Sequence, residues 1–267
     1  TNLSILIFYF IFSFSSLLFI ILAEYNNNKT PTLFLKQFVF YALGLGIIYL
    51  LQKIPIDYIE KLSIFFYLFT LILLAGIFLV PSNFAPIVNG ARSWYNLGLF
   101  TLQPSEFGKI ATVAMVSMLI KEKSFKGNTD TIKLLKLALI IAIPFILVLI
   151  ENDLGNGLFF IFLFLGLVFL VSNKGKTLFR IYSVVIVVLA IIILAALYFP
   201  RLLNFVGLKS YQLNRILSWL NPEAYKLDYS YQITQILKEV KLGGLTGTFA
   251  KNKNYIDEQF NDFIFSI

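Results

Sequence analysis

The chain alternates between long apolar runs and short polar stretches. An apolar run of about 18 or more residues spans a bilayer as a helix, and the shorter runs here approach that length with their flanks. Because the runs are apolar on every side and do not alternate, they favour helices over the strands of an outer-membrane barrel. The predicted spans are Leu3–Ala23, Phe34–Leu51, Ile64–Val80, Phe107–Ile120, Leu137–Ile150, Leu158–Val171 and Ile181–Phe199.

The first run, Leu3–Ala23, has the position of a secretory signal peptide. It is longer than the apolar core of such a signal, no basic residue precedes it, and further spans follow it. We therefore interpret it as a retained transmembrane helix. The predicted fold class is an all-α, polytopic helical membrane protein with about seven transmembrane helices in this chain.

Basic residues are unevenly shared between the predicted loops. The loops rich in Lys and Arg are Gln52–Ser63, Lys121–Lys136 and Ser172–Arg180. The loop Pro81–Gln103 carries one basic residue and Glu151–Gly157 carries none. Since short cytoplasmic loops are enriched in Lys and Arg, the pattern predicts a cytoplasmic N-terminus. The two poor loops, together with Pro200–Asn261, are then expected on the outer face.

The last part of the chain has a different character. Residues 200–261 mix eight basic and five acidic residues with short apolar stretches, which predicts a large extracytoplasmic loop with interfacial helices. Residues 262–267 become apolar again and predict the start of a further transmembrane helix. Residues 1–199 form the predicted helical bundle, and we expect the chain to be truncated at its C-terminal side.

Composition narrows the possible chemistry. The chain is 58% hydrophobic and 13% charged, against about 45–50% and about 25% in soluble domains, so a water-soluble enzyme is excluded. It has no Cys and no His, so catalysis must use carboxylates, Lys, Arg, Tyr or hydroxyls. The net charge of +8 is explained by basic cytoplasmic loops, and we expect no nucleic acid partner.

Ionisable residues at the edges of the predicted spans are candidates for function. Pro104 suits the first turn of a helix, which places Glu106 near the positive end of the helix dipole and Lys109 one turn further. The alternative is an ion pair that only helps the helix insert. Trp94 could be an interfacial aromatic residue, and Arg92 an anchor or a cation for a phosphate.

Two further acidic sites stand beside apolar runs. Glu151 and Asp153 have no basic residue nearby in sequence. One hypothesis is that they form an Asx turn. The other is that one of these carboxylates pairs with Lys109 or Arg92 across the bundle. Asp262 lies at the edge of the last apolar run, where a helix cap is the plain structural reading.

Six motifs, in order along the chain, resemble the SEDS family (shape, elongation, division and sporulation), which includes the rod-shape (RodA) and septation (FtsW) proteins of the bacterial inner membrane. The motifs are Gly90-Ala-Arg-Ser-Trp94, Gln103-Pro-Ser-Glu-Phe-Gly-Lys109, Asp153-Leu-Gly155, Arg215-Ile-Leu217 with Asn221-Pro-Glu223, Tyr231-Gln232 with Gly243-Gly-Leu245, and Asp262-Phe-Ile-Phe265. This resemblance covers essentially the whole chain, and within the family we lean to the rod-shape branch.

The resemblance implies a fold of about ten transmembrane helices in the inner membrane. It implies polymerisation of lipid II, the polyprenyl-diphosphate-linked disaccharide peptide, into glycan strands beside a class B penicillin-binding transpeptidase. It places the catalytic carboxylate on Asp262. The other functional positions that it implies are Arg92, Gln103, Glu106, Lys109 and Asp153.

The corresponding reaction is a glycosyl transfer in which Asp262 takes the proton of the attacking hydroxyl. The residues expected to bind the substrate and its leaving diphosphate are Arg92, Lys109, Arg215 and Gln103. Glu106, Asp153 and Trp94 support them. A divalent cation such as Mg²⁺ or Mn²⁺ is left open as a cofactor.

Two other classes of function remain open. A transporter that flips lipid II would need an inward-facing polar route, and a scaffold would only recruit the transpeptidase. The chain also departs from the family pattern: Phe260 replaces a usual His, Asn152 a usual Pro and Asn221 a usual Asp. These departures affect loop geometry more than the proposed catalytic role of Asp262, because Asp262 itself is retained.

Overall fold

The computed structural model describes residues 3–26, 30–88, 90–98, 100–172, 175–198, 214, 217–218 and 231–243. It divides into two compact units, one of residues 1–53 with 187–267 and one of residues 54–186. Arg215, Asp262 and most of the predicted outer loop 200–261 lie outside the described residues. The predicted domain division at residue 199 therefore stays a prediction.

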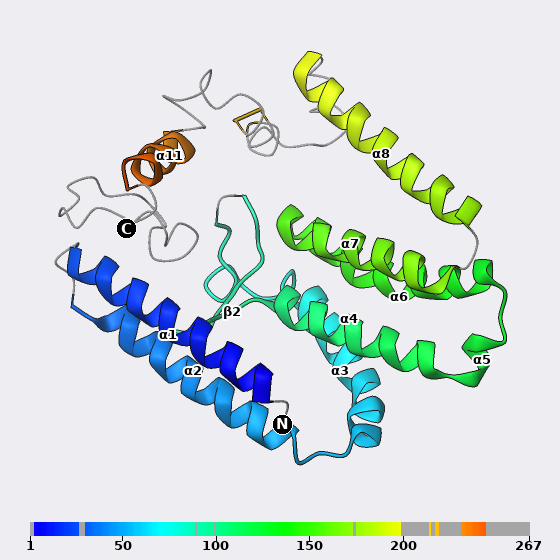
Figure 1. Ribbon diagram of the computed structural model, residues 1–267, viewed down its shortest axis with the longest axis horizontal. Coiled ribbons are helices and arrows are strands. Elements are labelled where there is room, and N and C mark those ends of the chain that lie inside the picture. Colours follow the sequence, from blue (N-terminus) through cyan, green and yellow to red (C-terminus); the bar gives the residue numbers. More distant parts are fainter. Residues whose placement is uncertain are drawn as a thin grey trace. The chain divides into compact units, whose positions relative to one another are not determined.

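In the first unit, helices α1 (Leu3–Asn26) and α2 (Thr32–Leu51) lie side by side as a hairpin (Figure 1). The carboxylate of Glu24 is buried and accepts the backbone N–H groups of Leu33 at 2.7 Å and Phe34 at 3.1 Å. These belong to the first turn of α2, whose N–H groups have no partner inside the helix. Helix α11 (Tyr231–Gly243) is strongly amphipathic, as predicted for an interfacial segment.

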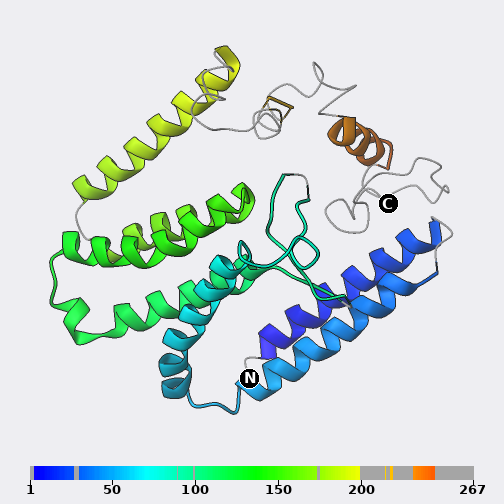
Figure 2. The same cartoon turned by 180° about the vertical axis from the view of Figure 1, so that it is seen from behind.

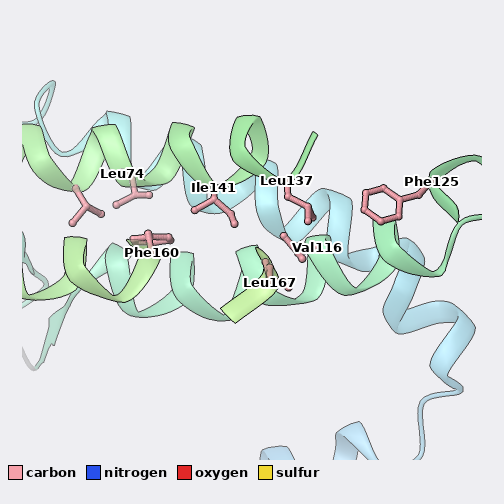
Figure 3. Close-up of a cluster of buried hydrophobic side chains, with 8 residues drawn as sticks. Leu74, Val116, Phe125, Leu137, Ile141, Phe160 and Leu167 are labelled. Atoms are coloured by element: carbon pink, nitrogen blue, oxygen red, sulfur yellow. The ribbon is translucent and has the colours of Figure 1, made fainter. Parts of the chain in front are cut away.

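The second unit contains the packed core. Its helices are α3 (Ile56–Gly76), α4 (Pro104–Lys121), α5 (Lys123–Lys126), α6 (Asp130–Ile150), α7 (Leu154–Val171) and the first part of α8 (Gly175–Tyr198). Helix α3 packs on α4, and α6 packs on α7, as both views show (Figures 1 and 2). Figure 3 shows Leu74, Leu137, Ile141 and Phe160 pointing into the space between these helices.

Six of the described helices are long and apolar enough to cross a membrane: α1, α2, α3, α6, α7 and residues Leu178–Ala195 of α8. This confirms the polytopic helical class. The predicted span Phe107–Ile120 is helical, but α4 is not among the six. Three charged residues within only 18 positions, together with several hydroxyl side chains, make it less apolar than the other long helices of the second unit.

The predicted span Ile64–Val80 was wrong in its limits, because α3 begins at Ile56 and ends at Gly76. Its first two turns are polar, which hides them from a search for apolar runs, yet Asp57 in the first turn suits the helix dipole. After α3 the chain forms a loop with a short antiparallel pair, β1 (Tyr95–Asn96) and β2 (Thr101–Leu102). The Tyr95 hydroxyl donates to the Leu73 carbonyl at 2.8 Å and ties this loop to α3.

Candidate functional site

Asp153 joins the start of α7 to the start of α4. As N-cap of α7, its Oδ1 accepts the backbone N–H of Asn156 at 3.1 Å. Its Oδ2 accepts the side-chain amides of Asn156 and of Gln103, both at 2.8 Å. Gln103 is the residue directly before α4. One carboxylate therefore holds the N-terminal ends of two helices together.

Lys109 lies one turn into α4. Its Nζ donates to Glu106 Oε1 at 2.8 Å and to Asn156 Oδ1 at 3.0 Å, and it lies 5.6 Å from the centroid of the Phe159 ring. The predicted pair between Glu106 and Lys109 is confirmed. The pairing of Asp153 with Lys109 is indirect, because the Asn156 amide stands between them.

Ser105, also in the first turn of α4, completes the arrangement by accepting the Asn156 side-chain N–H at 3.1 Å. Ser105 is fully buried. The side chains so joined are called here the α4–α7 polar network, and they are Gln103, Ser105, Glu106, Lys109, Asp153 and Asn156. Since two helix N-termini meet at this network, their free N–H groups and dipoles favour negative charge there.

Asn156 was not predicted. Its signal in the sequence is the Asp-x-x-Asn spacing at the start of an apolar helix, which is typical of a capped first turn. The spacing alone does not reveal that the same amide reaches Lys109 in another helix.

Arg92 holds the α3–α4 loop. Its Nε donates to the Ala85 carbonyl at 3.0 Å and its Nη2 to the Val80 carbonyl, while its backbone N–H donates to the Glu151 carbonyl at 3.1 Å. The described residues show no ion pair between Arg92 and a carboxylate. The structure thus supports the anchoring reading of Arg92, and a phosphate-binding role stays a prediction. Trp94, on the same loop, is 41% exposed.

Glu151 does not form the predicted pair with Lys109 or Arg92. Its side chain is fully buried, and neither of its carboxyl oxygens has a hydrogen-bond partner among the described residues. Burial, and then the negative charge of Asp153, raise the pKa of the Glu151 carboxyl to about 8. Glu151 is therefore mainly uncharged at neutral pH.

A divalent cation finds no ready site in the part of the chain that the structure describes. No three His, Cys, Asp or Glu side chains come together there, and hard cations need several oxygen ligands. Asp153 is bound by amides and Glu106 by Lys109. The described residues therefore do not fit a metal ion.

Fold and site together define a polytopic helical membrane protein with a polar network built at the N-terminal ends of two helices. The chain belongs to the FtsW, RodA and SpoVE family of cell cycle proteins, which it matches over residues 1–267. This confirms the predicted resemblance, which named RodA and FtsW.

Curated relatives agree with the family. The chain is 30% identical over 237 residues to a probable peptidoglycan glycosyltransferase FtsW of Wigglesworthia glossinidia brevipalpis, covering 87% of this chain and 58% of the relative. It is also 30% identical over 263 residues to the stage V sporulation protein E of Bacillus subtilis, covering 92% of this chain and 64% of the relative. The chain thus spans about three-fifths of the length of these relatives.

Solved structures share the fold. One belongs to a peptidoglycan synthase complex that coordinates polymerization and crosslinking, with a TM-score of 0.67, 24% identity and coverage of 95% of this chain and 68% of the other. Another is the rod shape determining protein RodA of Thermus thermophilus, with a TM-score of 0.54, 22% identity and coverage of 90% and 86%. Since the family's branches all occur among these relatives, the lean to the rod-shape branch stays a prediction.

Proposed function

We propose that this protein is a peptidoglycan glycosyltransferase that polymerises lipid II into glycan strands during cell elongation or division. The observation that carries the proposal is the α4–α7 polar network, in which Lys109 is held by Glu106 and Asn156 at the joined N-termini of two helices. Such a place suits a leaving group that gains negative charge. The FtsW relatives named as probable peptidoglycan glycosyltransferases support the same activity.

The proposed reaction is a glycosyl transfer between two lipid-linked chains. A sugar hydroxyl of one lipid-linked chain attacks the anomeric carbon of another, the bond to the diphosphate breaks, and polyprenyl diphosphate leaves. Asp262 accepts the proton of the attacking hydroxyl. Lys109 stabilises the charge on the leaving diphosphate, with Arg92 and Arg215 as the other proposed cations. Gln103 and Asp153 act indirectly. The Gln103 amide donates to the Asp153 carboxylate, and this carboxylate fixes the Asn156 amide that orients Lys109.

The lipid tail needs an apolar site at membrane depth. A cavity of about 260 Å³ lies between α6, α7 and α8, and its walls include Ile141, Phe145, Phe160, Phe164 and Ile181. Since its lining is apolar, it fits a hydrocarbon chain and offers nothing to a headgroup. It supports a lipid-linked substrate over a soluble one.

Location and partner are part of the proposal. The loops joined by the network, between α3 and α4 and between α6 and α7, both carry few basic residues, so they lie on the outer face of the bacterial inner membrane. A class B penicillin-binding transpeptidase is the proposed partner, which is supported by the likeness to a chain of a complex that joins polymerization with crosslinking.

Polymerisation of purified lipid II tests the proposal. We expect glycan product from the wild-type protein and at least about 100-fold less from Asp262→Ala, because a general base is lost. Undiminished product from a folded Asp262→Ala protein would contradict the role of Asp262 as the general base. Movement of labelled lipid II across a vesicle membrane without polymer would favour a transporter instead. Full cell-shape function of Asp262→Ala in cells would favour a scaffold.

A further inference from the structure

Unpartnered polar atoms gather where two outer segments meet. In the described residues, the buried side-chain atoms without a hydrogen-bond partner are Ser93 Oγ, Asn128 Nδ2 and both carboxyl oxygens of Glu151. Ser93 directly follows Arg92, whose backbone N–H donates to the Glu151 carbonyl at 3.1 Å. Three of the four atoms thus belong to the contact between the α3–α4 loop and the α6–α7 turn. Buried polar groups are normally paired, so this contact needs an explanation.

The backbone of the turn fixes Glu151 in place. Asn152 has a φ of 64°, its N–H donates to the Leu149 carbonyl at 3.0 Å, and the N–H of Asp153 donates to the Val148 carbonyl at 3.2 Å. These two bonds are the Schellman arrangement that ends a helix in a tight turn. Glu151 is the last residue before the left-handed position, and Asp153 caps the next helix. The backbone of Glu151 is therefore fixed between the end of α6 and the cap of α7.

The charges around Glu151 disfavour its anion. It stands at the C-terminal end of α6, where the helix dipole is negative, and two residues from the carboxylate of Asp153. Arg92 gives Nε and Nη2 hydrogens to loop carbonyls, and Tyr95 gives its hydroxyl hydrogen to a carbonyl of α3. Burial, and then the nearby Glu151, raise the pKa of the Tyr95 hydroxyl, while Arg92 lowers it. A buried carboxylate with no paired cation is far more costly than the neutral acid.

We propose that Glu151 is a positioning residue that works as an uncharged carboxylic acid, closing the Arg92 loop over the α6–α7 turn and so holding Asp153 in the α4–α7 polar network. Its catalytic consequence rests on the proposed glycosyltransferase function. When Glu151 loses its proton, the charge draws water into the contact and loosens the turn that carries Asp153. The network then no longer holds Lys109 in one place.

The direction of the pH effect follows from the raised pKa. The folded protein keeps the Glu151 proton up to about pH 8, whereas the unfolded chain releases it near pH 4.3. Between these values the folded state binds more protons, so the free energy of unfolding falls as the pH rises. The contribution of Glu151 to stability is thus fully present below the unfolded pKa and is lost as the pH rises through about 8.

Glu151→Gln is the sharpest variant, because glutamine has the shape of the protonated acid and cannot ionise. We expect the thermal midpoint of the wild-type protein in detergent to fall by roughly 5 °C or more between about pH 6 and about pH 9. The Glu151→Gln midpoint should fall by much less. Glu60→Gln is the matched control, because Glu60 is a partly exposed carboxylate paired with Lys121, and it should follow the wild type.

Infrared spectroscopy of the wild-type protein adds a measurement that needs no variant to fold. We expect a carboxylic acid C=O band at neutral pH that disappears as the pH rises through about 8. The polymerisation rate should show a falling limb in the same range, about tenfold per pH unit, that Glu151→Gln lacks. An ionised Glu151 at neutral pH, or equal pH responses of wild type and Glu151→Gln, would overturn the inference. Because midpoint and infrared band do not require activity, failure to polymerise lipid II would contradict only the proposed function.

Discussion

Asn156 is the residue that makes the polar network continuous. Its Oδ1 accepts from Lys109 while its Nδ2 donates to Asp153 and Ser105. An amide has both an acceptor and two donors, so it bridges a cation and a carboxylate in a way that neither a carboxylate nor a lysine could. The position of Lys109 therefore depends on a neutral side chain from another helix.

Asn156→Asp is the corresponding test at the residue scale. The new carboxylate keeps the acceptor for Lys109 but loses the donor to Asp153 and places like charges side by side. We expect lipid II polymerisation to fall about 10- to 100-fold, because displacing a positioned group is costly. Polymer yield and gel filtration of the purified protein measure activity and fold.

Asn96→Asp is the control for this change. Asn96 is exposed, and its Oδ1 accepts the Gly98 N–H at 3.1 Å, which an aspartate also does. We expect wild-type polymerisation from this variant. Equal activity of Asn156→Asp and Asn96→Asp would show that the bridge between Lys109 and Asp153 is dispensable.

The helices themselves depend on caps supplied from elsewhere in the chain. Helix α2 follows Pro31, which gives no side-chain cap, and Glu24 of α1 supplies both missing acceptors instead. Helix α7, in contrast, is capped locally by Asp153, the residue directly before it. Carboxylates in the turns thus provide acceptors for the free N–H groups where these two helices begin.

Glu24→Ala is predicted to weaken the α1–α2 hairpin. It removes two hydrogen bonds from backbone N–H groups in the first turn of α2 to the Glu24 carboxyl group, so we expect the free energy of unfolding to fall by about 2–3 kcal/mol. Denaturant unfolding in detergent measures the change. Glu60→Ala, at a partly exposed ion pair with Lys121, should cost under about 1 kcal/mol. Equal losses in the two variants would refute the capping role of Glu24.

The sequence predicts helices where apolar runs are long, and these are present. It does not predict the first two turns of α3, which are polar, or the pair Tyr95–Asn96 with Thr101–Leu102, because two-residue strands have no period to detect. At the site, the three-residue spacing predicts the Glu106–Lys109 pair. The link through Asn156 depends on how α7 packs against α4, which no local pattern contains.

Within the second unit, helix α4 packs against the largest number of other helices. Helix α4 contacts α3, α6 and α7, and it buries Ser105, Gly108 and Thr112. A Cβ on Gly108 would lie 3.4 Å from Leu74 Cδ1, which is an ordinary van der Waals distance, so the Leu74 side chain of α3 packs directly over this position of α4. Ser105 and Thr112 of α4 are buried, and Lys109 donates to Glu106 and Asn156, so these polar groups have protein partners, as polar residues in a membrane usually do.

The two ends of α4 offer a matched pair of lysines. Lys109 belongs to the polar network at the N-terminal end, and Lys121 pairs with Glu60 at the last residue of the helix. Both are ion-paired lysines on one helix, and only the first lies beside the proposed reaction. A change of either to methionine keeps length and removes charge, so the two variants separate catalysis from helix stability.

The most direct measurement of the central claim is therefore the rate of lipid II polymerisation by Lys109→Met beside Lys121→Met, with wild-type protein in the same detergent. If the α4–α7 polar network stabilises the leaving diphosphate, Lys109→Met loses about 100-fold in rate and Lys121→Met stays within about twofold of wild type. Wild-type polymerisation by a folded Lys109→Met protein, or an equal loss in both variants, would contradict the account.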